Sequence, residues 1–295
     1  MAGIIMCEPC ELYNILNQYS HVPRLAEINY LCLIDARERQ HYNVSHIVTA
    51  RHVKRDSDGT FLMPEAVEID SMQYIVVYDS DTSSLQGQGG AVECAQTLAK
   101  ASLYPIHIVK GGYQKFSALY PFLRTVKIMY TIMELETLQT YPVEIIAGLL
   151  YMGDHKQATN RNLREDLKIS AMVNISQSSS LEFEKGKQTI LNIPVADSVM
   201  SDLYSSFETL CVFIGSHLNM GSRVLICSSH GISRCSAVTI AFLMHHLKHT
   251  LQEAWEYVLK CKNNMRPNRG FVQQLSDWEL HTMGKTLTDV SEPHF

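Results

Sequence analysis

Residues 223–236 (RVLICSSHGISRCS) contain a short polar loop between an apolar strand and a predicted helix. The apolar run ends at Cys227, and apolar residues at helical spacing begin at Ala237. The backbone N–H groups of a loop in this position, together with the N-terminus of the following helix, favour binding of a dianion. The segment therefore predicts a phosphate-binding site.

Individual residues of the loop suit the same chemistry. Gly231 lacks a Cβ, so the backbone can approach a ligand closely at this position. Arg234 carries a planar guanidinium that can pair with two phosphate oxygens at once. The predicted phosphate-binding residues are Ser229, His230, Gly231, Ile232, Ser233 and Arg234.

The loop offers no ready nucleophile. A thiol ionises near neutral pH when a helix terminus and an arginine lower its pKa, whereas a serine hydroxyl needs an adjacent general base. His230 is the only candidate base in the loop, two residues from Ser228. Neighbouring side chains of a strand point to opposite faces, so the thiol of Cys227 should point away from the loop. A Ser228–His230 pair and a Cys227 thiolate are the alternatives to a site that only binds.

The loop resembles the HCxxGxxRS signature of the dual-specificity branch of the cysteine-dependent protein phosphatases. In that match Cys227 stands for the histidine, Ser228 for the nucleophilic cysteine, and Cys235 for the hydroxyl residue after the arginine. Residues 193–198 (IPVADS) resemble the general-acid loop of the family, which puts Asp197 in the acid position. Without a nucleophile Asp197 has no leaving group to protonate, so the resemblance implies a vestigial acid.

The resemblance continues in opening segments at 141–153 and in a closing motif at 266–271 (RPNRGF). It implies a dual-specificity phosphatase-like domain over residues 141–287 whose catalytic machinery is degenerate. Gly231 and Arg234 are retained, and neither needs a thiolate to hold a phosphate. Two interpretations stay open: a loop that still binds a phosphorylated side chain, and a structural relic filled by water or a stray anion, which is weighed because His230 adds bulk where small residues are usual.

The first half of the chain alternates strands and helices. Apolar strands are expected at 30–34, 74–78 and 105–109, with helices at about 91–102 and 113–124. Residues 33–37 (LIDAR), 45–47 (SHI) and 109–113 (VKGGY) resemble a rhodanese domain. Active rhodaneses have a cysteine just after the middle strand, where this chain has Asp79. A carboxylate cannot carry a persulfide, so the resemblance implies an inactive rhodanese-like domain.

The second half continues the alternation, with strands expected at 145–152, 171–175, 189–195 and 223–227. We therefore predict an α/β fold in which a rhodanese-like parallel-sheet domain precedes a dual-specificity phosphatase-like domain. The expected boundaries are 1–130 for the first domain, 131–140 for a hinge, 141–287 for the second domain and 288–295 for a tail.

This order of domains is similar to that of the mitogen-activated protein kinase phosphatases. With serine in place of the nucleophilic cysteine, it most resembles the pseudophosphatases of the serine/threonine/tyrosine-interacting-like type. In the kinase phosphatases the first domain docks a kinase through a basic cluster, and Arg51, Lys54 and Arg55 lie near the corresponding place. The alternative for these three residues is a solvated charged turn.

Composition limits the remaining possibilities. The net charge of −5 does not indicate a nucleic-acid-binding protein. No apolar run reaches the ~18 residues of a membrane span. The eight cysteines are scattered, which indicates reduced thiols in an intracellular protein. Cys7 and Cys10 form one CxxC pair without a second pair at metal-ligand spacing, so neither a metal nor a cofactor is expected. The N-terminus does not read as a signal peptide, which favours the cytoplasm, with mitochondria as the alternative.

The sequence thus favours a catalytically inactive phosphatase that acts as a regulatory binding protein or scaffold. The expected partners are phosphoproteins, mitogen-activated protein kinases or active phosphatases. The alternative is a weak dual-specificity phosphatase with residual activity.

Overall fold

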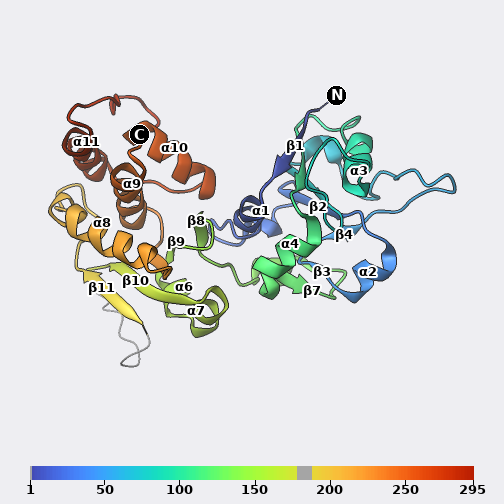
Figure 1. Cartoon of the computed structure of the whole chain (residues 1–295), viewed down its shortest axis with the longest axis horizontal. Coiled ribbons are helices and arrows are strands. Elements are labelled where there is room, and N and C mark those ends of the chain that lie inside the picture. Colours follow the sequence, from blue (N-terminus) through green and yellow to red (C-terminus); the bar gives the residue numbers. More distant parts are fainter. Residues whose placement is uncertain (1, 178–187) are drawn as a thin grey trace. The chain divides into compact units, whose positions relative to one another are not determined.

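The computed structural model describes residues 2–177 and 188–295. Two compact units, Met1–Gln139 and Thr140–Phe295, divide the chain (Figure 1). Each unit has its own sheet and its own hydrophobic core. Within the described ranges, no helix combines the length and the apolar character needed to cross a membrane.

The first unit is built on a five-stranded sheet in which every neighbouring pair of strands is parallel. The order across the sheet is β1 (Ile4–Cys7), β6 (Ile106–Val109), β5 (Tyr74–Tyr78), β2 (Leu31–Asp35) and β4 (Arg51–His52). The two central strands, β2 and β5, are buried over their last four residues, which explains why they read as continuous apolar runs. Strand β4 lies at an edge and pairs with β2 over only two residues.

The helices of the first unit connect these strands. They are α1 (Pro9–Leu16), α2 (Arg39–Val44), α3 (Gly90–Leu98) and α4 (Gly112–Leu119), with 3₁₀ turns at Arg24–Ala26, Ile69–Ser71 and Pro121–Leu123. A second, two-stranded sheet pairs β3 (His46–Ile47) with β7 (Arg124–Thr125). The short helix α5 (Ile132–Glu136) ends the unit, and a reciprocal capping box between Thr131 and Glu134 fixes its start.

The second unit contains a mixed five-stranded sheet. Its order is β11 (Thr189–Ile193), β10 (Ile169–Ile175), β12 (Arg223–Ser228), β9 (Leu150–Asp154) and β8 (Val143–Ile146). The pairs are parallel except for β8 and β9, which are antiparallel. The continuous strand expected at 145–152 is therefore wrong. Gly148, with φ +69°, lies in the tight turn that separates the two strands, and the apolar run 145–152 concealed this turn.

Six helices of the described ranges accompany this sheet. They are α6 (His155–Thr159), α7 (Arg161–Leu167), α8 (Tyr204–Asn219), α9 (Arg234–Leu247), α10 (Leu251–Cys261) and α11 (Arg269–Met283). Helix α9 is buried continuously over its first eleven residues, and α8, α10 and α11 all pack against it (Figure 1). A helix apolar on all sides is expected at the centre of a core. The predicted α/β organisation of both halves is confirmed.

The buried carboxylate of Glu279 ties the chain's last segment to this core. The side chain, on α11, is fully buried and accepts hydrogen bonds from the backbone N–H groups of Leu251, Leu287 and Thr288, each at 2.8–2.9 Å. The hydroxyl of Thr288 donates a fourth, at 2.8 Å. Burial raises the pKa of Glu279, but the N–H donors outweigh it and hold the pKa below its ordinary value of 4.5.

We predict that Glu279→Gln destabilises the second unit by ~2 kcal/mol, because an amide NH₂ would face backbone donors. The depressed pKa means that the stabilisation is fully present above pH ~4.5 and is lost as the pH falls through the folded-state pKa. Urea unfolding followed by tryptophan fluorescence reports on this unit alone, since Trp255 and Trp278 are the chain's two tryptophans. Glu292→Gln, at an exposed position, is the control. Equal stability of the two variants at pH 7 would contradict the role of Glu279.

Candidate phosphate-binding site

The polar loop at 229–233 lies at the carboxyl end of three adjacent parallel strands. Ser228, the last residue of β12, is in register with Ile175 on β10 and with Asp154 on β9. Helix α9 begins at Arg234, directly after the loop. Ligands of α/β sheets bind at this end of the strands, because the loops and helix N-termini collect there.

Gly231 is the position at which the loop requires a glycine. Its φ is +67°, and a Cβ built there would lie 2.9–3.0 Å from backbone atoms of Gly153 and Asp154. Both the conformation and the close approach to the end of β9 exclude a side chain. The glycine therefore fixes the shape of the loop rather than only freeing space for a ligand.

The guanidinium of Arg234 is buried, with 6% of the residue exposed, and holds two loops together. Its Nη1 donates to the carbonyl of Val195 (2.9 Å), and its Nη2 donates to the hydroxyl of Ser229 (3.0 Å). Its Nε has no hydrogen-bond partner among the described residues. A buried guanidinium N–H without an acceptor is costly, so this edge of the fork is suited to an anion that enters the loop.

The closing segment at 266–268 fixes the rest of the loop. The N–H of Arg266 donates to the carbonyl of Ile232 (2.9 Å), which also accepts from the hydroxyl of Ser236 (2.6 Å). The N–H of Asn268 donates to the hydroxyl of Ser233 (3.1 Å). The loop is thus preorganised by hydrogen bonds from outside it.

Asp197 belongs to the same network. Its Oδ1 accepts a hydrogen bond from the Ser233 hydroxyl (2.7 Å) and another from Asn268 Nδ2 (2.8 Å). These bonds place a carboxylate beside the loop, at an exposed position. They also give the side chain a structural role, since it links the 193–198 segment to the loop and to the start of α11. Sequence reasoning did not find Asn268 as its partner.

The positions around the expected nucleophile carry an exchanged pair of side chains. Ser228 is 2% exposed, and its hydroxyl lowers the pKa of the Cys235 thiol in the first turn of α9. A hydroxyl therefore stands where the resemblance has a thiol, and a thiol stands where it has a hydroxyl. Burial raises the pKa of Cys235 above its ordinary value. This thiol lies behind Ser228 in the core and is kept protonated.

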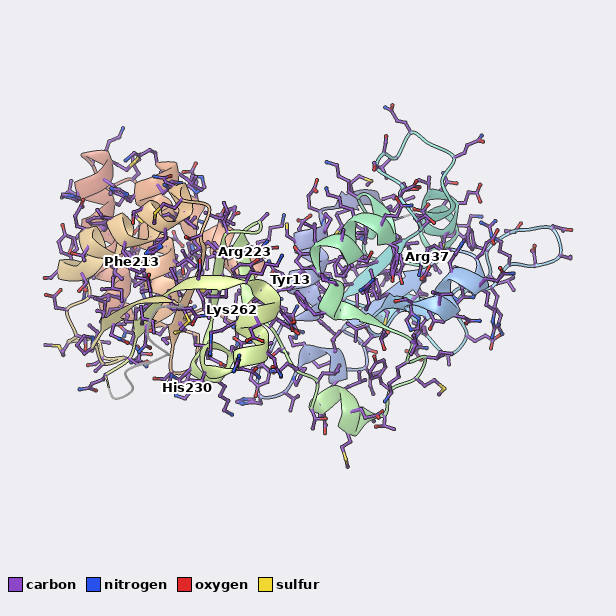
Figure 2. All side chains as sticks on the ribbon, turned by 60° about the horizontal axis from the view of Figure 1, so that its bottom comes forward. Tyr13, Arg37, Phe213, Arg223, His230 and Lys262 are labelled. Carbon is purple, nitrogen blue, oxygen red and sulfur yellow. The ribbon has the colours of Figure 1, made fainter. Side chains whose placement is uncertain are left out.

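Cys227 is equally closed to solvent. Its residue exposure is 0%, and its Sγ donates to Asn174 Oδ1 on the adjacent strand β10 at 3.9 Å. Burial raises its pKa strongly. His230 is exposed, and no hydrogen bond joins it to Ser228 in the described part of the chain (Figure 2). Neither a thiolate nor a base-activated hydroxyl is formed by this arrangement.

Lys262, which sequence reasoning missed, adds a cationic group near Cys235 and Asp154 (Figure 2). It follows α10, and burial lowers its pKa below the ordinary value, while Cys235 and Asp154 act in the opposite direction. A lone lysine twelve residues beyond the capping residue of its helix carries no signal in a single sequence. Its place near these two residues depends on how α10 packs against α9.

In the first unit, Asp79 is the residue that the sequence resemblance matches to the rhodanese cysteine. Its Oδ1 accepts from the N–H groups of Asp81 and Thr82 (3.2 and 2.9 Å). Its Oδ2 accepts from the Thr82 hydroxyl (2.6 Å) and from the N–H of Ala91 in the first turn of α3 (3.0 Å). The helix N-terminus that could bind a ligand anion is therefore occupied by a carboxylate of the chain itself.

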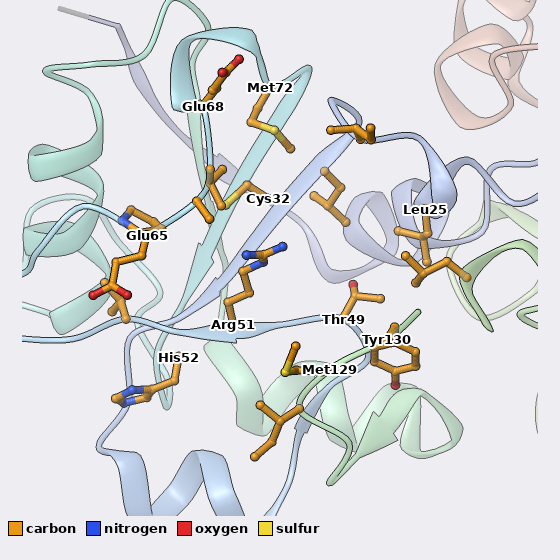
Figure 3. Close-up of a pocket in the computed structure, with 18 of the residues that line it drawn as sticks. Leu25, Cys32, Thr49, Arg51, His52, Glu65, Glu68, Met72, Met129 and Tyr130 are labelled. Atoms are coloured by element: carbon orange, nitrogen blue, oxygen red, sulfur yellow. The ribbon is translucent and has the colours of Figure 1, made fainter. Parts of the chain in front are cut away.

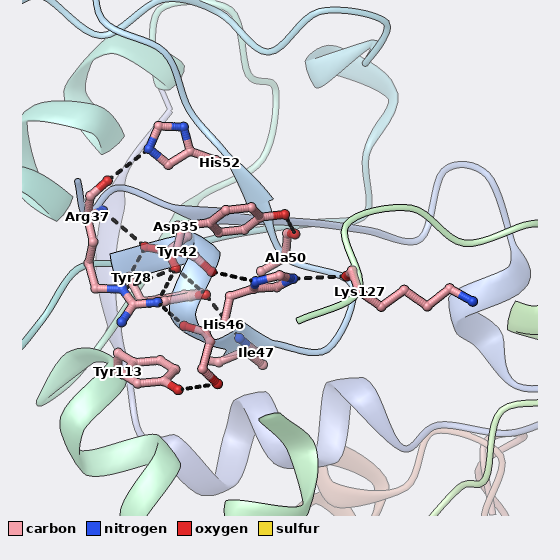
Figure 4. Close-up of polar contacts among 11 residues, drawn as sticks. Asp35, Arg37, Tyr42, His46, Ile47, Ala50, His52, Tyr78, Tyr113 and Lys127 are labelled. Atoms are coloured by element: carbon pink, nitrogen blue, oxygen red, sulfur yellow. Dashed lines mark hydrogen bonds and ion pairs between the residues drawn. The ribbon is translucent and has the colours of Figure 1, made fainter. Parts of the chain in front are cut away.

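The motif residues of the first unit meet in one buried network (Figure 4). Asp35, with 0% exposure, accepts from the Arg37 guanidinium (2.6–3.1 Å) and from the Tyr78 hydroxyl (2.8 Å). Arg37 also donates to the carbonyl of Ser45 (2.8 Å) and stacks over the ring of Tyr113 at 3.8 Å. Burial raises the pKa of Tyr78 well above its ordinary value. The network is fully paired and structural.

The three basic residues considered for docking differ in their contacts. Lys54 pairs with Glu65 at 2.9 Å. Arg55 lies over the ring of Phe61 and approaches Glu93 at 3.5 Å. Arg51 has neither an ion pair nor a hydrogen bond from its side chain within the described ranges, and it is exposed. Only one of the three cations is therefore available without breaking an internal contact.

Comparison with protein families identifies both units. The description "Dual specificity phosphatase, catalytic domain" matches residues 150–281, and "Rhodanese-like domain" matches residues 11–119. The fold expected from the sequence, a rhodanese-like domain followed by a dual-specificity phosphatase-like domain, is thereby confirmed.

The chain is also similar to individual proteins. Human dual specificity protein phosphatase 1 is 28% identical over 290 residues, which cover 85% of this chain and 78% of the relative. A probable rhodanese domain-containing dual specificity protein phosphatase of Dictyostelium discoideum is 30% identical over 62% of this chain and 39% of its own length. Among solved structures, the human tyrosine phosphatase-like serine/threonine/tyrosine-interacting protein matches with 25% identity and a TM-score of 0.44, covering 48% of this chain and 96% of that one.

We predict that Gly231→Ala destabilises the second unit more than Gly221→Ala does. Both glycines have positive φ, +67° and +73°, but a Cβ at Gly221 meets nothing within 4 Å. The control should cost ~1–2 kcal/mol for the left-handed backbone alone. Gly231→Ala adds the collision with Gly153, and we expect at least ~1 kcal/mol more, measured by urea unfolding. Equal costs would show that the loop does not need the close approach.

Proposed function

Because this chain consists of a rhodanese-like domain followed by a dual-specificity phosphatase domain, we propose that it is a pseudophosphatase: it binds phosphorylated side chains in the 229–234 loop and does not hydrolyse them. It would act as a regulatory binding protein or scaffold in phosphorylation signalling. The observation that carries the proposal is the unpartnered Nε of the buried Arg234 beside a nucleophile position occupied by Ser228.

The proposed absence of phosphate-ester hydrolysis follows from the chemistry of Ser228. Attack on phosphorus needs an ionised nucleophile, and a hydroxyl with no base in contact stays neutral. The nearby thiols of Cys227 and Cys235 are buried, and their pKa values are raised. Two changes would be needed at once to restore a thiolate at the loop, a thiol at position 228 and a polar partner at position 227.

Retention of binding follows from the parts of the loop that do not depend on a thiol. Gly231 holds the backbone in its bent form, and hydrogen bonds from Arg266 and Asn268 preorganise it. Arg234 supplies charge and directional donors. An incoming phosphate oxygen would accept from the free Nε and replace or share the Nη2 bond to Ser229. Preorganisation lowers the cost of binding, because little must move.

The partners that fit are phosphoproteins, mitogen-activated protein kinases or active phosphatases. A phosphorylated segment of a partner would occupy the loop. The rhodanese-like unit would supply a second contact, for which Arg51, Lys54 and Arg55 are the candidate docking residues. Of these, Arg51 alone is without an internal partner in the described residues.

A weak phosphatase is the second candidate function. It is favoured by the carboxylate of Asp197, which still lies beside the loop through its bonds to Ser233 and Asn268. Hydrolysis of a phosphate ester by the unaltered chain, lost in Arg234→Ala, would support this alternative over binding alone.

We predict that Arg234→Ala weakens binding of O-phosphotyrosine about tenfold or more, since charge-assisted hydrogen bonds contribute ~1.5–3 kcal/mol each. Arg234→Lys keeps the charge but loses the fork, and should also weaken binding. Isothermal titration calorimetry measures both, with Arg161→Ala on α7 as the matched control. Thermal unfolding must show that each variant is folded. Unchanged affinity in folded Arg234→Ala would overturn the assignment of the site.

A further inference from the structure

A cavity of about 830 Å³ lies in the rhodanese-like unit (Figure 3). All of its lining residues fall between Leu25 and Leu135, so it belongs to the first unit alone and is separate from the phosphate loop. Nothing proposed for Ser228 or Arg234 bears on it. Its volume is within the ~300–1,000 Å³ of typical small-molecule sites.

The floor of this cavity is apolar and buried. Cys32 on β2, Val53 after β4, and Met72 after the 3₁₀ turn line it, with exposures of 2%, 4% and 4%. Exposed apolar side chains also line the cavity. They are Leu62 and Met63, which follow β4 in the chain, and Ile128, Met129 and Ile132 from the end of the unit. Exposed apolar side chains gathered around one concavity indicate a binding site.

Arg51 is a charged group within this lining (Figure 3). It extends from the edge strand β4 into the cavity, and three hydroxyl-bearing side chains, those of Tyr42, Thr49 and Tyr130, also line it. The side chain of Arg51 has neither an ion pair nor a hydrogen bond in the described ranges. A cavity that combines buried apolar side chains with such a guanidinium suits a molecule that has an anionic head and an apolar body.

The other charges of the lining do not cancel Arg51. Lys54 pairs with Glu65 at 2.9 Å, and Glu27 pairs with Arg24 outside the lining at 2.9 Å. His52 contacts the carbonyl of Arg37 through Nε2 at 3.0 Å.

Two lining side chains remain to be counted beside Arg51, the cation of Arg39 and the carboxylate of Glu68. Neither has a side-chain ion pair in the described residues, and together they are neutral. The lining itself carries three cations and three carboxylates, and one positive charge remains once Arg24, which pairs with Glu27 from outside the lining, is counted.

The backbone of the cavity is strained at two places. Four non-glycine residues of the described ranges have positive φ. Two of them, Lys168 and Lys248, cap the C-termini of α7 and α9, which accounts for their conformation. The other two, Thr49 (φ 65°) and Ala66 (φ 58°), both line the cavity and cap no helix. Such strain collects at functional sites, where the surrounding structure maintains it.

We propose that this cavity of the rhodanese-like unit binds a small amphipathic organic anion, with the carboxylate or other anionic head on Arg51 and the apolar body over Cys32, Val53 and Met72. The single uncompensated charge fits one anionic head. A cavity lined by the buried side chains of Cys32, Val53 and Met72 fits a small molecule better than a flat protein surface. The unit that has lost the rhodanese cysteine would in this way retain a ligand-binding role of its own.

Decanoate, used below its micelle-forming concentration, is a suitable probe. Binding to the full chain is measured by calorimetry and by NMR of methionine methyl groups, with Met63, Met72 and Met129 as the lining reporters, assigned through single Met→Leu variants. We expect saturable binding that shifts these three signals and leaves the methionines of the second unit unchanged. Neutral 1-decanol and acetate separate the apolar contribution from the charge.

Arg51→Met removes the charge at nearly constant volume and should weaken decanoate binding about tenfold or more, while 1-decanol binding stays unchanged. Lys100→Met, at an exposed position away from the cavity, is the matched control. Met129→Glu places a negative charge at an exposed position of the lining and should also weaken decanoate binding without unfolding the unit.

Several results would overturn the proposal. The first is that decanoate shows no saturable binding. The second is that Arg51→Met binds decanoate as tightly as the unaltered chain does. The third is that decanoate shifts the methyl signals of methionines in both units. A fourth is an acidic amphipathic peptide that binds at Arg51 and is not displaced by decanoate, which would make the cavity a protein-docking surface instead.

Discussion

The buried guanidinium of Arg234 is the interaction on which the phosphate loop depends. One nitrogen anchors the 193–198 segment through the Val195 carbonyl, a second holds the Ser229 hydroxyl, and the third has no partner in the described residues. A guanidinium carries five N–H donors, and a buried cation is stabilised when these donors find acceptors. The fold supplies an acceptor to each of the two Nη atoms, and we propose that an anion accepts from the Nε–H. Gly231, Ser233 and the closing segment all serve to keep this geometry.

Phosphate binding and phosphate-ester hydrolysis are separable in such a site because they depend on different chemical groups. Binding uses backbone N–H groups, a helix N-terminus and Arg234, none of which needs to change its protonation state. Hydrolysis needs an ionised nucleophile, and we propose that Ser228, beside the buried thiol of Cys235, does not supply one. In the first unit, Asp79 places a carboxylate at the N-terminus of α3.

Local signals in the sequence predicted much of this architecture. The strand, loop and helix around Gly231 and Arg234 could be read because the strand is continuously apolar and the loop residues are chemically specific. The strand expected at 145–152 was wrong, since a turn at Gly148 splits an apolar run that has no polar break. Contacts such as Asn268 with Asp197, and the cavity around Arg51, bring together distant segments. These contacts arise from tertiary packing alone, so no pattern in a single sequence predicts them.

The central claim is that the loop holds a phosphorylated side chain without cleaving it. The most direct measurement follows one sample of a ³²P-labelled phosphopeptide over time and records both the peptide bound and the inorganic phosphate released. The account predicts saturable binding by the unaltered chain with no release, and release only after Cys227→His and Ser228→Cys are combined. Release by the unaltered chain at a rate comparable to that of the double variant would contradict it, as would the absence of any binding.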